Sequence, residues 1–369
     1  MSGRNFGRTG VCALLLTGIL TGQAGAVGTS ASSAVLLEQQ SGRVLYEQNA
    51  DEERLIASIT KIMTAVVALE HGSLQQEYTV TAQDMAEGSS MYLKPGDTLR
   101  LEELLYGLML VSGNDAALAV AHCVSGETED FVALMNEAAR NLGMAHSHFV
   151  NPNGLDADGH YASARDMAVL AAHALKNQDF RRIVSTASIT IGDRYLANHN
   201  KLLRLCEGCI GVKTGFTKAA GRTLVSAAQR GGMTLVCVTL NDGDDWNDHI
   251  ALLDYGFSEY RLERAAAGGQ ILASTRVRSG TAASVPLMAA EDLCYPLTGE
   301  ERLTVVARTP VSVPAPVVPG QAIGEVCAYL NGEEVASVEL VAAAPSAKRA
   351  VEESGGSGWW ERLFGASGS

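Results

Sequence analysis

Ser58-Ile-Thr-Lys61 is the stretch of sequence from which the rest of the chain is best interpreted. It opens a run, residues 60–70, in which apolar side chains recur at helical spacing. Two residues three positions apart lie on one face of a helix, with Cβ atoms about 5–6 Å apart. The Lys61 amine can therefore reach the Ser58 hydroxyl and activate it as a nucleophile without a histidine.

A lysine that acts as a base must be neutral, and neutrality has a cost. An ordinary lysine has a pKa of roughly 10.4, so holding Lys61 neutral at pH 7 requires about 4.6 kcal/mol. Burial together with a second nearby cation lowers a lysine pKa by this much. Lys213 is the candidate for that cation. An isolated S-x-x-K pattern is far more often an ordinary helix face, so its meaning depends on what accompanies it.

Two more polar strings follow, Ser112-Gly-Asn114 and Lys213-Thr-Gly215. In the first, a hydroxyl can pass a proton to a leaving group and a carboxamide can hold a substrate amide. Either side chain can instead cap the helix that follows. In the second, which ends a predicted strand, a cation beside a hydroxyl suits a carboxylate, and Gly215 leaves room for substrate. Phe216 can offer its backbone N–H to an oxyanion together with that of Ser58.

The wider pattern predicts a mixed catalytic unit over residues 27–264. Strand-like runs at 34–37 and 43–46 flank a turn and form a hairpin. Predicted helices cover 60–70, 101–110, a segment from about 115, 131–142, 164–175 and 248–257, and predicted strands cover 211–213, 222–228 and 234–240. Residues 268–344 are rich in Val and Thr, with Pro and Gly between the strand-like runs, and predict a small all-β domain.

Composition narrows the function classes. The 369 residues leave room for two domains, and the net charge of −13 argues against a nucleic-acid partner. Of seven cysteines, Cys12 lies within the first 26 residues, so six remain, too few for a disulfide scaffold. The pair Cys206-Glu-Gly-Cys209 is interpreted as a local disulfide or two ordinary thiols. A zinc site would need two more ligands, and only His199 is near in sequence.

Both ends of the sequence carry targeting-like patterns. Residues 1–26 have a basic start, an apolar run and small residues at 24–26, which is typical of a secretory signal and predicts export. Residues 345–369 are predicted to be a linker and a tail. One helical face of that tail is compatible with an interfacial membrane anchor, and equally with a frayed terminus. Its apolar residues are Trp359, Trp360, Leu363 and Phe364.

The three strings together resemble the signature of the penicillin-binding proteins and serine β-lactamases. Longer stretches resemble more specifically the low-molecular-mass D-alanyl-D-alanine carboxypeptidases. These stretches are Ala57-Ser-Ile-Thr-Lys-Ile-Met-Thr64, Ser90-Met-Tyr-Leu-Lys-Pro-Gly-Asp97, Leu110-Val-Ser-Gly-Asn-Asp-Ala116, His148-Phe-Val-Asn-Pro-Asn-Gly-Leu155 and Gly211-Val-Lys-Thr-Gly-Phe-Thr217. The resemblance implies an α/β (α+β) penicillin-binding-protein-like fold: an antiparallel sheet with helices on both faces and a helical subdomain, followed by the small all-β domain.

The resemblance also implies a reaction and its residues. A serine peptidase would remove the terminal D-alanine from peptidoglycan stem pentapeptides, and β-lactams would acylate it. Ser58 would form the acyl-enzyme, Lys61 would be its base, and Ser112 would relay a proton to the leaving group. On the substrate side, Asn114 would orient the acyl amide, Lys213 and Thr214 would bind the terminal carboxylate, and Gly215 and Phe216 would border it.

Two other functions are weighed against this one. A class A β-lactamase carries a glutamate four residues before an asparagine, whereas Val132 precedes Asn136 at that spacing. A non-catalytic binder of cell-wall peptide or penicillin would not need every site residue to be present. No cofactor is expected, because the sequence has no G-x-G-x-x-G, complete P-loop or H-E-x-x-H pattern. No metal is expected either, and His146 and His148 are taken as polar loop residues.

Overall fold

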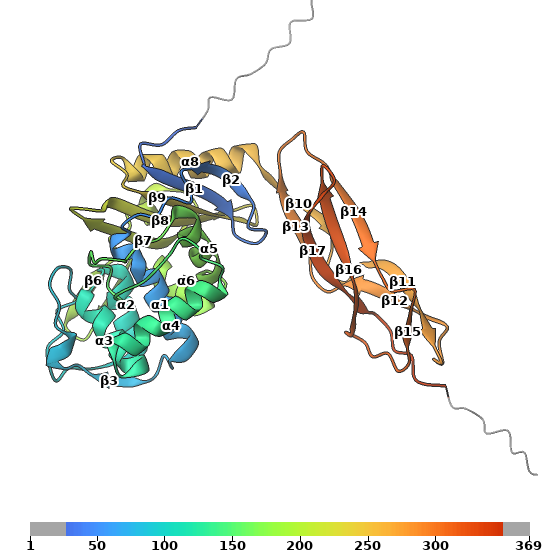
Figure 1. The fold of residues 1–369 in the computed structure, drawn as a ribbon, viewed down its shortest axis with the longest axis horizontal. Helices are drawn as coiled ribbons and strands as arrows, with labels where there is room; N and C mark the ends of the chain where they lie inside the picture. The colour runs from blue at the N-terminus through green and yellow to red at the C-terminus, as the bar shows by residue number, and fades with distance from the viewer. Residues whose placement is uncertain (1–26, 350–369) are drawn as a thin grey trace, which may run out of the picture.

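The computed structural model describes residues 27–349, and the predicted signal sequence and membrane-anchoring tail lie outside them. Two units follow one another along the chain (Figure 1). The first is a mixed sheet-and-helix unit, and the second is built of strands alone. No helix within 27–349 has the length and apolar character needed to span a bilayer.

The centre of the first unit is a five-stranded antiparallel sheet. Its order is β2-β1-β9-β8-β7, so β1 of the N-terminal hairpin pairs with β9, a strand from the far end of the unit's sequence. The strands are β1 (Ser33–Glu38), β2 (Val44–Gln48), β7 (Cys209–Thr217), β8 (Gly221–Arg230) and β9 (Met233–Leu240). The predicted hairpin and late strands are confirmed.

Helices cover both faces of this sheet, which is why most residues of its inner strands are buried. Successive side chains of a strand point to opposite faces. Thus Val35 and Leu37 of β1 face the larger core, whereas Leu36 faces a second core under α8 (Asp245–Glu259). α1 (Lys61–His71) and α5 (Ala164–Ala174) pack on the other face (Figure 1). The expected sheet with helices on both faces is confirmed.

A helical subdomain extends below the sheet (Figure 1). It forms one wall of the candidate active site described below. It contains α2 (Leu101–Leu110), α3 (Asn114–Ser125), α4 (Thr128–Asn141) and the short pair β3 (Glu77–Thr79) and β4 (Thr98–Arg100). The predicted helices all lie here or on the sheet. The sequence did not predict β3 and β4. It also did not predict η2 (Ala82–Asp84), α6 (Gln178–Ser185), the hairpin β5 (Ser188–Ile191) and β6 (Arg194–Ala197), or α7 (Leu202–Leu205).

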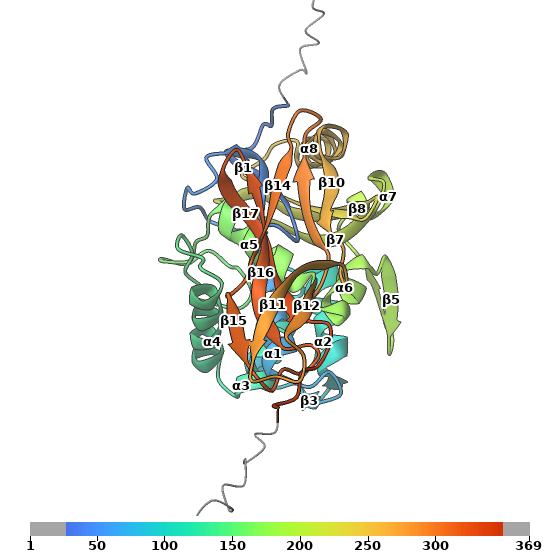
Figure 2. The ribbon, with the colours of Figure 1, turned by 90° about the vertical axis from the view of Figure 1, so that its right-hand side faces the viewer.

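The second unit contains β10–β17 and is drawn in front of the first in Figure 2. Its main sheet has the order β14-β16-β17-β12-β11-β15, and β10 pairs with β13. The strands are β10 (Arg261–Ala266), β11 (Ile271–Arg278), β12 (Ser284–Ala289), β13 (Leu293–Leu297), β14 (Leu303–Arg308), β15 (Ser312–Pro314), β16 (Ala322–Leu330) and β17 (Glu333–Ala342).

The predicted limits of the β unit need correction at both ends. β10 begins at Arg261, inside the stretch assigned to the catalytic unit, because it pairs with β13. At the other end, Ser346 bridges Val317 and Lys348 bridges Gly280, so residues 345–349 belong to the sheet unit rather than to a linker. Strand pairing, which composition does not reveal, sets both limits.

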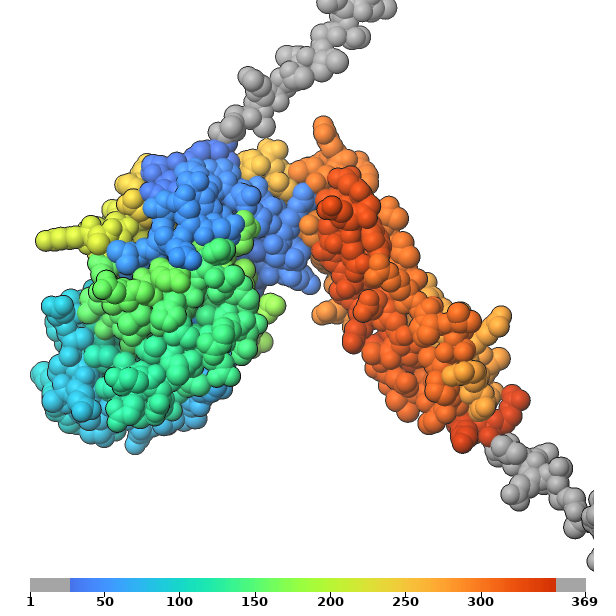
Figure 3. Space-filling model, in the orientation of Figure 1, coloured from blue at the N-terminus to red at the C-terminus, as the bar shows by residue number. Residues whose placement is uncertain are grey.

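One arginine connects the two units where they touch (Figure 3). Arg43, in the turn after β1, donates to Glu301 at 2.6 and 2.9 Å and to the carbonyl of Pro296 at 2.6 Å. Its guanidinium also lies 5.2 Å from the ring centre of Tyr260 and 5.3 Å from that of Tyr295. Charge-assisted bonds and cation–π contacts therefore fix the hairpin of the first unit against the second.

Candidate active site

Ser58 lies in a tight turn that precedes α1. The turn is the 3₁₀ helix η1 (Ala57–Thr60), so the serine stands just before the α-helix and not within its first turn as the sequence predicts. Ala57 has φ of 48°, a conformation that non-glycine residues rarely adopt. Thr223 of β8 donates to the carbonyl of Ile56 at 3.0 Å and ties this turn to the sheet.

Lys61 is fully buried at the first position of α1. Its Nζ lies 3.0 Å from Ser58 Oγ and 2.8 Å from Asn114 Oδ1, and it donates to the carbonyl of Asn153. Burial lowers the pKa of Lys61 well below its usual value, the positive charge of Lys213 lowers it further, and Asp115 acts in the opposite direction. Burial and a second cation are the two causes that the sequence predicts.

The second string forms the turn between α2 and α3. Ser112, not Gly113, takes the left-handed backbone conformation, with φ of 62°. Gly113 is needed for space, because a Cβ there would lie 2.7 Å from Asp115 Oδ1 and 3.1 Å from the backbone nitrogen of Met91. The Asn114 side chain does not cap α3. Its Oδ1 accepts from Lys61, and its Nδ2 donates to the carbonyl of Glu87 at 2.6 Å.

The third string lies in the middle of β7, not at its end, because β7 runs on to Thr217. Lys213 is buried, and burial lowers its pKa to about 7. Its Nζ donates to the carbonyl of Thr214 at 2.8 Å. Gly215 allows β7 to approach the nucleophile turn, since a Cβ there would lie 3.0 Å from the backbone nitrogen of Ser58. The side chain of Phe216, which follows, is 66% exposed.

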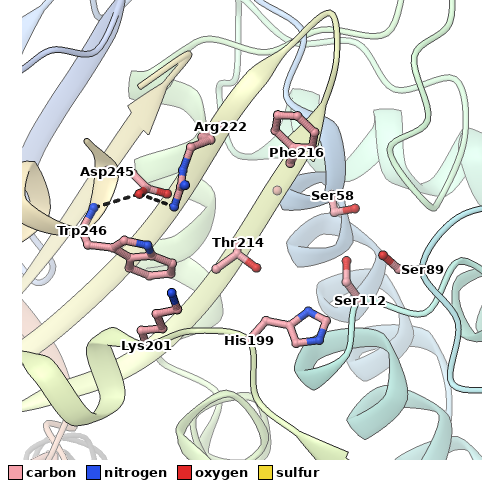
Figure 4. Close-up of a pocket in the computed structure, with 11 residues that line it drawn as sticks. Ser58, Ser89, Ser112, His199, Lys201, Thr214, Phe216, Arg222, Asp245 and Trp246 are labelled. Carbon is pink, nitrogen blue, oxygen red and sulfur yellow. Dashed lines mark hydrogen bonds and ion pairs between the residues drawn. The ribbon is translucent and has the colours of Figure 1, made fainter. Parts of the chain in front are cut away.

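The three strings meet at one end of a cavity of about 530 Å³ (Figure 4). Ser58, Ser112 and Ser89 stand on the helical side, and Thr214, Gly215 and Phe216 stand on the β7 side. Lys61, Asn114 and Lys213 are buried behind this lining. Such an arrangement can carry out acyl transfer: it holds a hydroxyl, a buried amine beside it and a hydroxyl next to a cation.

Known protein families match most of this sequence. The family described as D-alanyl-D-alanine carboxypeptidase matches residues 21–244, and the one described as Penicillin-binding protein 5, C-terminal domain matches residues 260–347. The chain belongs to the D-alanyl-D-alanine carboxypeptidase family. The expected serine carboxypeptidase function is thereby confirmed, and nothing in these comparisons favours a β-lactamase or a non-catalytic binder.

Individual carboxypeptidases agree with this assignment. The D-alanyl-D-alanine carboxypeptidase DacF of Bacillus subtilis is 33% identical over 330 residues, covering 85% of each chain. DacC of Escherichia coli is 32% identical over 336 residues, covering 86% of this chain and 84% of its own. The crystal structure of penicillin binding protein 5 from Haemophilus influenzae aligns with a TM-score of 0.73 and 28% identity, covering 87% of this chain and 98% of its own. The expected fold is confirmed.

Several residues of this carboxypeptidase site were not found from the sequence. Asn153 contributes only its backbone carbonyl, which no side-chain pattern reveals. Ser89 precedes the quoted stretch that begins at Ser90. His199 lines the cavity near Ser112, and the far end is lined by Lys201, Arg222, Asp245 and Trp246 (Figure 4). These come from three separate segments, so no local spacing brings them together.

The cysteine pair beside β7 has no role in this geometry. Cys206 and Cys209 are both free thiols. Burial raises the pKa of each, to about 11 for Cys209, which makes a reactive thiolate less accessible. The sequence left open a local disulfide or two ordinary thiols, and the structure shows two ordinary thiols. No cluster of three or more metal-ligating side chains occurs within residues 27–349.

Proposed function

We propose that this carboxypeptidase removes the terminal D-alanine from peptidoglycan stem peptides through an acyl-enzyme on Ser58. The observation that carries the proposal is the set of neighbours around Lys61 Nζ: Ser58 Oγ at 3.0 Å, Asn114 Oδ1 at 2.8 Å and the carbonyl oxygen of Asn153. A neutral amine has two N–H bonds and one lone pair. Its two hydrogens go to the two carbonyl acceptors, which have no hydrogen to give, so the lone pair is left for the Ser58 hydroxyl.

Acylation follows from this arrangement. Ser58 Oγ attacks the carbonyl carbon of the penultimate D-alanine while Lys61 takes the hydroxyl proton. The negative charge that develops on the carbonyl oxygen is stabilised by the backbone N–H groups of Ser58 and Phe216, which Gly215 allows to lie close together. The C–N bond then breaks, and the proton passes through Ser112 to the departing amine. Water hydrolyses the ester and restores Ser58.

The substrate is held by groups on both sides of the cavity. Thr214 donates to the terminal carboxylate, and Lys213 provides positive charge from behind it. Burial alone lowers the pKa of Lys213 to about 7. A substrate carboxylate nearby favours the charged form of the lysine and opposes this shift. Asn114 uses one lone pair and one N–H within the protein, which leaves a second N–H for the substrate's acyl carbonyl.

The place of action is part of the proposal. A peptidoglycan substrate requires an enzyme outside the cytoplasmic membrane, and the signal-like pattern of residues 1–26 supports export. Contact of the tail with the outer face of that membrane is supported only by the spacing of its aromatic and apolar residues. β-Lactams are expected to acylate Ser58, since they offer an amide next to a carboxylate.

Two measurements on the purified protein test the proposal. Release of D-alanine from a diacylated tripeptide ending in D-Ala-D-Ala should be absent in Ser58→Ala, and mass spectrometry should place labelled penicillin on the peptide that contains Ser58. Equal release by Ser58→Ala, or a label on another residue, would refute the mechanism. Rapid turnover of a chromogenic cephalosporin would point to a β-lactamase instead.

A further inference from the structure

Tyr92 combines an exposed ring with a strained backbone. The residue is 78% exposed, and its φ of 62° lies in the left-handed region, which a bulky residue rarely adopts. Strained conformations of this kind persist only where the surrounding structure enforces them, and they gather at sites that grip ligands. Tyr92 takes no part in the acyl-transfer geometry described above, so the proposed reaction does not account for its conformation.

A buried carboxylate holds the main chain on both sides of Tyr92. Asp115, in the first turn of α3, accepts from the Ser90 hydroxyl at 2.6 Å and from the backbone N–H groups of Met91 and Leu93, each at 3.0 Å. Ser90 Oγ in turn accepts the N–H of Tyr92 at 2.7 Å. These bonds fix the backbone of the loop, whereas no hydrogen bond within residues 27–349 engages the Tyr92 hydroxyl.

The hairpin of β5 and β6 fixes the carbonyl of Tyr92. Arg194, the first residue of β6, donates to that carbonyl from Nε and Nη2, each at 3.3 Å. Its Nη2 also forms an ion pair with Asp97 at 2.5 Å. The next residue of the strand, Tyr195, is 69% exposed. One set of contacts therefore enforces the strained loop and brings a second exposed tyrosine to it.

Tyr92 and Tyr195 line the same hollow, which has a volume of about 330 Å³. Ser90 and Val111 line it too, and the residues next to them, Ser89 and Ser112, line the acyl-transfer cavity beside Ser58 (Figure 4). The hollow is thus separate from that cavity but adjacent to it. Its volume lies within the range of roughly 300–1,000 Å³ that is typical of small-ligand sites.

The polar groups of the hollow favour an uncharged ligand. Lys94 and Asp193 both line it, and their opposite charges balance. The Asp193 side chain is 89% exposed and lies 3.8 Å from Arg194, and within residues 27–349 no carboxylate lies at ion-pair distance from Lys94. Both side chains can therefore donate to or accept from hydroxyl and amide groups. The face of an aromatic ring packs against the C–H groups of a sugar ring, and a sugar also carries those polar groups at its edge.

We propose that Tyr92 and Tyr195 form a subsite for an N-acetylated sugar of the glycan strand to which the stem peptide is attached. The proposal rests on the proposed function, which supplies the peptide end of that substrate. In a stem pentapeptide, three residues separate the penultimate D-alanine from the sugar, and three extended residues span about 10 Å. The sugar of a bound substrate must therefore lie near the acyl-transfer cavity, as the hollow does. The subsite changes no covalent step.

The test compares two pentapeptides that differ only in the sugar. One is a disaccharide pentapeptide, and the other is the same pentapeptide with an acetyl group on its first residue. The variants are Tyr92→Ala and Tyr195→Ala, and Tyr92→Phe keeps the ring face without the hydroxyl. Val311→Ala is the matched control, because it truncates an apolar residue of the β unit that is 85% exposed.

Wild type should release D-alanine from the disaccharide pentapeptide with a kcat/KM about tenfold above that for the acetylated peptide. Each alanine variant should lose most of this preference through a higher KM, while its kcat/KM for the acetylated peptide changes less than about twofold. Tyr92→Phe and Val311→Ala should resemble wild type on both substrates.

Two results would overturn the subsite. One is a wild-type kcat/KM that is the same for the two pentapeptides, since the sugar would then contribute nothing. The other is an equal loss on both substrates in the alanine variants, since the tyrosines would then act on the peptide or on the fold. Failure of wild type to release D-alanine from either pentapeptide would instead refute the proposed function, and the subsite with it.

Discussion

The catalytic unit and the β unit bury polar groups in different ways. Lys61 and Lys213 are buried in the catalytic unit, and within residues 27–349 neither has a carboxylate at ion-pair distance. The buried polar residues of the β unit are Thr275 and Ser346, both neutral and hydrogen-bonded. Uncompensated buried charge is costly, and single domains are stable by only about 5–15 kcal/mol. The catalytic unit therefore gives up stability at the place where the proposed mechanism needs a neutral amine and a carboxylate site.

The largest effect should come from removing the buried base. Lys61→Ala should lower the rate at which penicillin acylates Ser58 by about a thousandfold, because general-base catalysis and the orientation of the hydroxyl are both lost. Stopped-flow or quenched labelling measures this rate. Lys176→Ala, which removes an exposed lysine after α5, should acylate like wild type. A loss of less than tenfold in Lys61→Ala would mean that another group activates Ser58.

Lys213→Met tests whether the charge buried in the catalytic unit lowers its stability. The variant should lose carboxypeptidase activity by at least about a hundredfold, since the charge behind the carboxylate is gone. It should nevertheless unfold at a higher urea concentration, with about 1–4 kcal/mol of added stability, because an apolar chain replaces a buried charge. Thr275→Val is the counterpart in the β unit. It should cost about 1 kcal/mol, because the carbonyl of Pro310 loses its donor.

The pH dependence of stability should separate wild type from that variant. Burial lowers the pKa of Lys213 to about 7, from 10.5 for an unperturbed lysine. Between about pH 7 and 9 the unfolded chain therefore binds more protons than the folded one, and stability rises with pH. Wild type should gain about 2 kcal/mol relative to Lys213→Met across this window. Urea titrations at both pH values measure it, and an unchanged difference would show that Lys213 stays charged in the fold.

The smallest effect on activity should come from the contact between the two units. Arg43→Ala removes the ion pair between Arg43, whose side chain is 15% exposed, and Glu301, whose side chain is 22% exposed. It also removes the contacts of the guanidinium with two tyrosine rings. Stability should fall by about 1 kcal/mol, while activity on a soluble tripeptide should stay within about twofold of wild type. Calorimetry should show the two units unfolding less cooperatively. A large loss of activity would mean that the β unit shapes the catalytic cavity.

The sequence predicts the long, strongly patterned elements well. α2 begins and ends at the predicted residues, and β9 is buried along its length because helices cover both faces. α6 was missed because its short, charged stretch buries only three residues. The serine and lysine motifs were found because their chemistry is concentrated in neighbouring residues. The carbonyl of Asn153 and the cations around Trp246 were not, because a backbone group and a convergence of distant segments leave no local pattern.

β7 is the last strand of its sheet, with β8 on one side and the cavity along Thr214, Gly215 and Phe216 on the other. An edge strand presents unpaired backbone groups, which proteins usually cover to avoid aggregation. Here that edge borders the nucleophile, and an extended peptide can pair with it as an added strand. The main chain of the substrate would then set the alignment of the bond to be cut. Side-chain pockets would only have to distinguish one residue from another, and an inhibitor shaped as a β-strand would compete for the same edge.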